Sequence, residues 1–235
     1  MEKLRILIVE DEAAIREGLI DVFIYHGYDV DYAEDGALGL EKALTSTFDL
    51  VLLDVMLPTM NGFDICNAIR QQDREQAIIM LTAKSSDEDI IKGLSLGADD
   101  YVAKPFSVAQ LVLRVQSVLR RTQTVKEQNQ QITLNSQRVV DCLNMSGQFD
   151  GEDIHFTRRE IDILNYLHAH SQRPVSRQEL LNKVWGYAED VELETRTVDI
   201  HIAKLRRKIE VNSSDPQFLA TIRGAGYRLI ADDNV

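Results

Sequence analysis

Cysteine, long apolar runs and excess positive charge are all scarce in this 235-residue chain. Its two cysteines, Cys66 and Cys142, lie far apart and form neither a CxxC pair nor a Cys/His cluster, which argues against a disulfide framework or a zinc site. We expect both to be buried or semi-buried thiols in a reducing cytosol. No apolar run approaches the roughly 18 residues of a membrane span, and acids at positions 10–12 interrupt any signal-peptide core. These absences predict a soluble cytoplasmic protein.

Charge is unevenly distributed along the chain. Acids outnumber bases by 38 to 26, a net charge of −12, which excludes a uniformly basic wrapper of nucleic acid. Residues 1–121 hold 21 acids and 12 bases, and residues 122–235 hold 17 acids and 14 bases. Within Thr195–Arg228 the balance reverses to 7 bases against 3 acids. This asymmetry predicts two modules with different partners.

The first half alternates between short β-branched runs and segments with helical apolar spacing. The expected strands are Arg5–Val9, Tyr28–Ala33, Leu50–Leu53, Ile78–Leu81 and Tyr101–Ala103. The expected helices are Glu12–Tyr25, Gly36–Leu44, Phe63–Ile69, Glu88–Leu96 and Ser107–Leu119. Five strands alternating with five helices predict an α/β fold whose parallel sheet is covered on both faces. Such sheets bind ligands at the carboxyl ends of their strands.

The second half has a different pattern. A polar stretch at 121–131 predicts a linker, and turn residues between short strand-like pieces at 132–154 predict an antiparallel meander. Capping-box signatures at Thr157 and Ser176 open helices at Ile161–His168 and Leu180–Trp185. A third helix is expected at Thr195–Glu210, and a hairpin turns at Gly224–Gly226. Three helices followed by a hairpin predict an α+β winged helix-turn-helix.

Chemically active residues follow the predicted strands of the first half. Glu10 and Asp11 end the first strand, Asp54 the third and Thr82 the fourth, and Lys104 follows the fifth. A cluster of carboxylates is costly without a cation, and its oxygen ligands suit Mg²⁺. The hydroxyl and ammonium groups suit phosphoryl oxygens. We therefore expect Asp54, at the middle of the rim, to attack a phosphoryl group and form an aspartyl phosphate.

Two sets of motifs resemble a known family over nearly the whole chain. The first half resembles the receiver domain of bacterial response regulators through Glu10-Asp11-Glu12, Asp54-Val-Met-Leu-Pro58, Asn61-Gly62, Leu81-Thr82-Ala83, Gly97-Ala-Asp-Asp-Tyr101 and Lys104-Pro105-Phe106. The second half resembles the winged-helix effector of the OmpR/PhoB family through Trp185-Gly186, Arg196-Thr-Val-Asp-Ile-His201, Leu205-Arg-Arg-Lys208 and Arg223-Gly-Ala-Gly-Tyr-Arg228. The resemblance implies a two-component response regulator that controls transcription.

The resemblance also implies an organisation and a set of receiver residues. A flavodoxin-like (βα)5 receiver would span residues 1–121, a linker 122–131 and the DNA-binding effector 132–235. A sensor histidine kinase would phosphorylate Asp54, and the only catalysis would be Mg²⁺-dependent self-phosphorylation and self-dephosphorylation. The implied Mg²⁺ ligands are Asp11, Asp54, the main-chain carbonyl of Met56 and, through water, Glu10. The implied phosphoryl-binding and switch residues are Thr82, Ala83, Tyr101 and Lys104.

The predicted helix Thr195–Glu210 carries a basic, hydrogen-bonding face that suits a major groove. We expect this face to lie opposite an apolar stripe that begins at Val198, with His201 and Lys204 reaching base edges and Arg223 reaching the minor groove or a phosphate. The implied DNA-binding residues are Trp185, Arg196, Thr197, His201, Lys204, Arg206, Lys208, Thr221, Arg223 and Tyr227. Ala203 stands where relatives often carry a basic residue.

The resemblance implies a homodimer in the phosphorylated state. Its face would comprise the fourth helix, fifth strand and fifth helix, with charged pairs across a two-fold axis from Lys92, Asp99, Asp100, Arg114 and Arg121. Ile90 and Gln110 replace a basic–acidic pair of many relatives, which predicts a weaker or more apolar dimer. The acidic loop 187–194 is equally consistent with a contact to RNA polymerase and with a simple solvated loop.

Three other interpretations account for parts of the sequence. A phosphatase of the haloacid dehalogenase type needs a second Asp two residues after the first, where this chain has Met56. A dinucleotide-binding fold needs a GxGxxG motif, and none follows the first strand. A phosphorylation-independent DNA-binding regulator with an inactive receiver is the remaining alternative, which the complete set of pocket residues disfavours.

Overall fold

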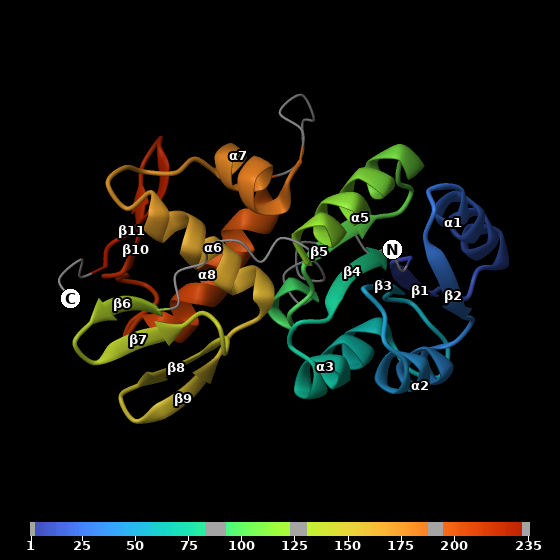
Figure 1. Ribbon diagram of the computed structural model, residues 1–235. Coiled ribbons are helices and arrows are strands. Elements are labelled where there is room, and N and C mark those ends of the chain that lie inside the picture. The colour runs from blue at the N-terminus through green and yellow to red at the C-terminus, as the bar shows by residue number, and fades with distance from the viewer. Residues whose placement is uncertain (1–2, 83–92, 123–130, 188–194, 232–235) are drawn as a thin grey trace. The chain divides into compact units, whose positions relative to one another are not determined.

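The chain folds into two compact units, Met1–Thr124 and Val125–Val235. The computed structural model describes residues 3–82, 93–122, 131–187 and 195–231, and Figure 1 shows its helices and strands. Within this described part, no helix is long and apolar enough to cross a membrane. Both cysteines are buried, as predicted, and burial raises the pKa of the Cys142 thiol to about 11.

The N-terminal unit is built on a five-stranded parallel sheet in the order β2-β1-β3-β4-β5. The strands are β1 (Arg5–Val9), β2 (Asp29–Ala33), β3 (Leu50–Asp54), β4 (Ala77–Thr82) and β5 (Asp100–Ala103). The helices are α1 (Ala13–Tyr25), α2 (Gly36–Thr45), α3 (Gly62–Gln72) and α5 (Val108–Thr122). Helices α1 and α5 cover one face of the sheet, and α2 and α3 cover the other (Figure 1).

The predicted parallel sheet is therefore confirmed. Its central strand β3 is buried along its whole length, which explains why Leu50–Leu53 reads as a continuous apolar run rather than an alternating one. Most of the helix expected at Glu88–Leu96 lies outside the described residues.

The described residues of the C-terminal unit form a four-stranded antiparallel sheet, three helices and a hairpin. The sheet strands are β6 (Gln131–Asn135), β7 (Arg138–Asp141), β8 (Ser146–Phe149) and β9 (Glu152–His155). The helices are α6 (Arg158–Ala169), α7 (Arg177–Leu180), which continues into the π-helical turn Leu181–Trp185, and α8 (Arg196–Ile209). The hairpin strands are β10 (Leu219–Ile222) and β11 (Gly226–Leu229). The expected winged helix-turn-helix is confirmed.

The two predicted capping boxes have different outcomes. At α6 the box is complete: the Glu160 backbone N–H bonds to the Thr157 hydroxyl, and the Thr157 N–H donates to the Glu160 carboxylate. At α7 only half of it forms. The Ser176 hydroxyl accepts from the Glu179 N–H, but the Glu179 carboxylate binds Arg173 and Tyr166 instead. The prediction of a reciprocal bond at Ser176 is therefore wrong. The charged guanidinium of Arg173 is a stronger donor to the Glu179 carboxylate than a backbone N–H is.

The hairpin is fixed to the start of α7 by backbone contacts. Val175 and Tyr227 exchange two N–H···O bonds of 2.8 and 2.9 Å. The approach requires glycine next to Tyr227, since Gly226 has a φ of +123° and a Cβ there would lie 2.0 Å from the Val175 carbonyl oxygen. The hairpin is thus held at its base, and its tip is exposed.

Candidate functional site

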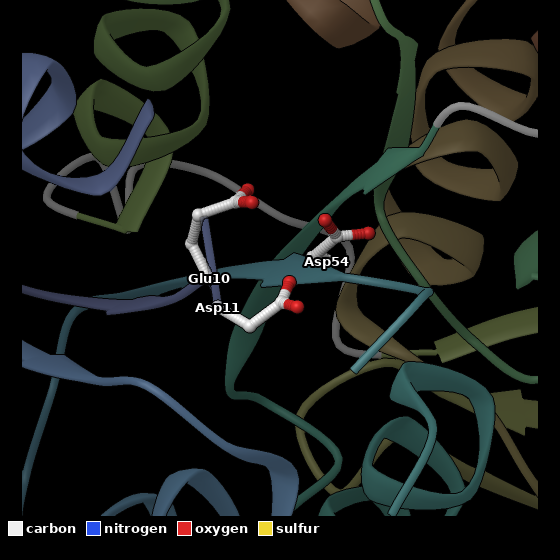
Figure 2. Close-up of side chains that lie close together, drawn as sticks. All are labelled: Glu10, Asp11 and Asp54. Carbon is white, nitrogen blue, oxygen red and sulfur yellow. The ribbon is translucent and has the colours of Figure 1, made fainter. Parts of the chain in front are cut away.

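Three carboxylates meet at the carboxyl end of the parallel sheet. Glu10 and Asp11 follow β1, and Asp54 ends the adjacent strand β3. Figure 2 shows their side chains turned toward one another. One oxygen from each lies within 4.8 Å of the others. Glu10 and Asp54 are buried and Asp11 is exposed, so the cluster opens to solvent on one side.

Lys104 is the counter-charge of this cluster. Its Nζ lies 2.8 and 2.7 Å from the two carboxylate oxygens of Glu10 and 2.5 Å from Oδ2 of Asp54. Burial raises the pKa of Glu10 to about 7, although Lys104 opposes the shift. Burial would lower the pKa of Lys104, but its hydrogen bonds to Asp54 and Glu10 raise it above the usual value. The geometry therefore favours a further cation beside the acids.

A backbone N–H of the loop after β3 fixes the position of the Asp54 carboxylate. Its Oδ1 accepts a 2.9 Å hydrogen bond from the Met56 N–H. Helix α3 begins directly against the end of β3, since a Cβ on Gly62 would lie 2.2 Å from the Asp54 carbonyl oxygen. Asn61 caps α3 by accepting from the Asp64 N–H at 3.0 Å. The motif Asn61-Gly62 thus explains how a helix fits beside the reactive strand end.

Thr82 and Tyr101 occupy the neighbouring strands β4 and β5 and are both buried. The carbonyl of Thr82 accepts a 2.7 Å hydrogen bond from the Lys104 N–H, which ties the end of β4 to the lysine. A Cβ on Gly93 would lie 3.5 Å from the Tyr101 ring. Ala83, the other expected phosphoryl-binding residue, lies outside the described residues.

Arg16 supports the site, a role that the sequence motifs did not predict. Its guanidinium donates to the main-chain carbonyls of Glu10 and Asp11 at 2.9 and 3.0 Å, and so holds the turn that presents both acids. The available signal was its spacing: Arg16 shares the buried face of α1 with Leu19 and Phe23. A charged residue at a core position of a helix indicates a specific partner.

The exposed face of α8 differs from the face predicted from the sequence. Ala203 and Arg207 are exposed, whereas His201 is 1% exposed and packs edge-on against the buried Trp185, with 5.3 Å between ring centroids. The predictions that His201 reaches base edges and that Trp185 is available to the DNA backbone are wrong for this conformation. Trp185 also packs beneath the Arg159 guanidinium, 4.7 Å from the ring centroid.

Two lysines of α8 bind a buried carboxylate. Lys204 Nζ lies 3.2 Å from Oε1 of Glu160, and Lys208 Nζ lies 2.6 Å from Oε2. The side chain of Lys204 is only 12% exposed. Both lysines therefore face α6 rather than lying opposite the apolar stripe, which corrects their predicted orientation.

The base of the hairpin carries a second polar network. The Tyr227 hydroxyl donates to Asp199 at 2.6 Å. Arg177 donates to Asp199 at 2.6 Å and to the Tyr227 hydroxyl at 2.9 Å. Tyr227 is 4% exposed, so its predicted DNA contact is not available here. Arg206 donates to the Leu219 carbonyl and to Thr221. Arg223 is exposed at the hairpin tip, and its groove or phosphate contact stays a prediction.

Both units of the chain match known protein families. The response regulator receiver domain family matches residues 6–116, and the C-terminal domain family of transcriptional regulatory proteins matches residues 151–229. The response regulator ArlR of Staphylococcus haemolyticus is 40% identical over 223 residues, which cover 94% of this chain and 97% of that protein. The chain belongs to the OmpR/PhoB family of response regulators. It has a receiver and a DNA-binding domain and is not a classical enzyme.

Two further relatives support the family over the full length. The alkaline phosphatase synthesis transcriptional regulatory protein PhoP of Bacillus subtilis is 39% identical, with 96% of each chain covered. The structure of DrrB, an OmpR/PhoB homologue from Thermotoga maritima, is 30% identical with a TM-score of 0.53 and covers 98% of this chain. A response regulator of this family implies DNA and a histidine kinase as partners.

The expected dimer face of this response regulator holds ion pairs within one chain. The buried Asp99 binds Arg70 at 3.1 Å, and the buried Asp100 binds Arg114 at 2.6 Å. These acids are therefore already paired, whereas pairs across a two-fold axis were predicted for Asp99, Asp100 and Arg114. Lys92 and the side chain of Arg121 lie outside the described part of the chain.

Proposed function

We propose that Asp54 accepts a phosphoryl group from a sensor histidine kinase and that phosphorylation controls DNA binding by the effector domain. The observation that carries this proposal is the Asp54 carboxylate at the end of the central strand, between two further acids and the Lys104 ammonium. In the transfer, an oxygen of Asp54 bonds to phosphorus while the phosphorus–nitrogen bond of the kinase phosphohistidine breaks. The bonding pair returns to the imidazole nitrogen.

The residues of the pocket fit a magnesium ion. We infer that Asp11, Asp54 and the main-chain carbonyl of Met56 hold it directly and that Glu10 holds it through water. Mg²⁺ favours such an all-oxygen donor set, in which one or two carboxylates bind directly and waters complete the coordination. A bound Mg²⁺ neutralises charge on the phosphoryl oxygens. Lys104 then exchanges its bond to Asp54 for a phosphoryl oxygen, and the Thr82 hydroxyl donates to another.

Removal of divalent metal should prevent labelling of this protein. With acetyl phosphate and Mg²⁺, intact-mass analysis should detect one added phosphoryl group, and with EDTA none, because the clustered carboxylates repel an anionic donor. Mg²⁺ added in excess over EDTA should restore labelling. Equal labelling with and without EDTA would contradict the magnesium assignment.

For the effector domain we propose DNA contacts through the exposed side of α8 and the hairpin tip. Arg196, Thr197, Thr221 and Arg223 are partly or fully exposed on these elements. In a dimer, each effector domain is joined to its receiver by the linker at residues 122–131. When the receivers dimerise, the two effector domains engage repeated DNA sites, because the second contact then occurs at high effective concentration. We also propose that the acidic loop 187–194 contacts RNA polymerase. Because its partner is DNA, the protein should act in the cytoplasm.

Phosphorylation should shift the protein from monomer to dimer. The added dianion captures Thr82 and Lys104, and so alters the β4–β5 side of the receiver that carries Asp99, Asp100 and Arg114. Beryllofluoride mimics the phosphoryl group, and sedimentation at micromolar protein should show the shift only when it is present. An unchanged sedimentation coefficient together with unchanged DNA affinity would favour phosphorylation-independent DNA binding.

A further inference from the structure

We propose that Arg207 is a DNA phosphate contact of α8, and that Glu160 restricts Lys204 and Lys208 to a structural role. This rests on the DNA contact proposed above for α8. The helix carries five basic residues, and all of them except Arg207 were expected to reach DNA. Their partners in the structure divide these cations into two groups.

The first group is held by Glu160. This carboxylate is fully buried in the first turn of α6, where it also accepts a 2.8 Å hydrogen bond from the Thr157 N–H. It is bound by Lys204 at 3.2 Å and by Lys208 at 2.6 Å. Lys208 donates in addition to the His155 carbonyl at 2.8 Å. Moving either lysine to a DNA phosphate would leave a buried carboxylate less compensated, which is unfavourable.

Arg207 has the opposite surroundings. Its side chain is exposed, and it forms no ion pair or hydrogen bond with any residue that the structure describes. It lies one turn beyond the exposed Ala203, on the same side of the helix as the half-buried Arg196. A guanidinium without a protein partner retains its full hydrogen-bonding capacity for a phosphodiester.

The net charge of the chain indicates that the electrostatic attraction to DNA arises from a small part of its surface. The protein carries a net charge of −12, so the electrostatic component of DNA binding must come from a few cations on the contact surface. Lys204 and Lys208 are bound to Glu160, and Arg206 is bound to the hairpin. The remaining cations of α8 and the hairpin tip are the exposed Arg207 and Arg223 and the partly exposed Arg196. Each phosphate contact adds about 0.9 to the slope of log affinity against log salt.

The test compares two adjacent residues in the full-length protein. Fluorescence anisotropy with a 30-base-pair duplex of random sequence, titrated with NaCl, gives the salt slope for Arg207→Ala and Lys208→Ala. Arg207→Ala should reduce the slope by about one unit, so that affinity falls about 3.5-fold less than in the wild type between about 50 and 200 mM salt. Lys208→Ala should leave the slope unchanged and lower the midpoint of urea unfolding. Arg207→Lys should restore the slope.

The controls separate the possible failures. Arg207 lies in the last helical turn, where a cation also stabilises the helix dipole, but that role would change the unfolding midpoint and not the slope. An unchanged slope in Arg207→Ala overturns the inference, and so does an equal loss of slope in Lys208→Ala. If Lys208→Ala does not fold, Lys204→Gln provides the same comparison. No binding of the wild-type protein to any duplex would instead refute the DNA contact proposed for α8.

Discussion

Replacement of Asp54 by Asn should abolish phosphorylation of this response regulator. The amide has no anionic oxygen to attack phosphorus, and the substitution also removes one of the three carboxylates that suit a cation. Acetyl phosphate with Mg²⁺ should add one phosphoryl group to the wild-type protein and none to Asp54→Asn, as measured by intact mass. The expected effect is complete loss.

Asp35→Asn is a matched control for this result. Asp35 follows β2 at the same rim of the sheet, but it is partly exposed and caps α2 by accepting from the Leu38 N–H. Asn is also a good N-cap, so folding and labelling should both be retained. Labelling of Asp54→Asn to the wild-type extent would contradict the phosphoacceptor assignment and would require another nucleophile at the rim.

The receiver pocket could be predicted from the sequence because a parallel sheet determines where its strand ends lie. Once the strands are assigned, Glu10, Asp54 and Lys104 must converge on one rim, and the structure brings them within hydrogen-bonding distance through Lys104. Arg16 could not be placed in the same way. Its contacts are to main-chain carbonyls, and these depend on the exact turn between β1 and α1 rather than on any residue pattern.

The faces of α8 were less predictable because this helix packs against more than one element. An amphipathic pattern marks only the apolar stripe, and a long polar side chain beside that stripe can bury its stem while its head finds a partner. Lys204 and Lys208 do this toward Glu160, and His201 packs against Trp185. The capping box correctly predicted Thr157 as the N-cap of α6, although the helix begins at Arg158 and not at the expected Ile161, and it did not indicate that the same carboxylate binds α8.

Removal of the Glu160 carboxylate should destabilise the effector domain strongly. Glu160→Ala loses the reciprocal cap of α6 and leaves Lys204 and Lys208 without their counter-charge, which should cost about 2–4 kcal/mol of unfolding free energy. Glu160→Gln keeps an acceptor for the Thr157 N–H and should cost less. Trp185 is the only tryptophan and is buried in this domain, so its fluorescence during urea unfolding reports the effector within the full-length chain.

The charge of Glu160 also predicts how this stability depends on pH. Burial alone would raise the pKa of Glu160, but Lys204, Lys208 and the Thr157 N–H outweigh it and hold the pKa below its usual 4.5. A carboxyl group whose pKa is lower in the folded state stabilises the protein above its unfolded pKa, and this contribution is lost as the pH falls through the folded pKa. The difference in unfolding free energy between wild type and Glu160→Gln should therefore be full at neutral pH and should shrink as the solution is acidified below about pH 4.5.

Replacement of the exposed Glu152 on β9 by Gln is the matched control, and it should change the unfolding free energy little at any pH. Equal stability of Glu160→Gln and wild type at neutral pH would show that the two lysines gain nothing from Glu160, and that they are free to move to DNA.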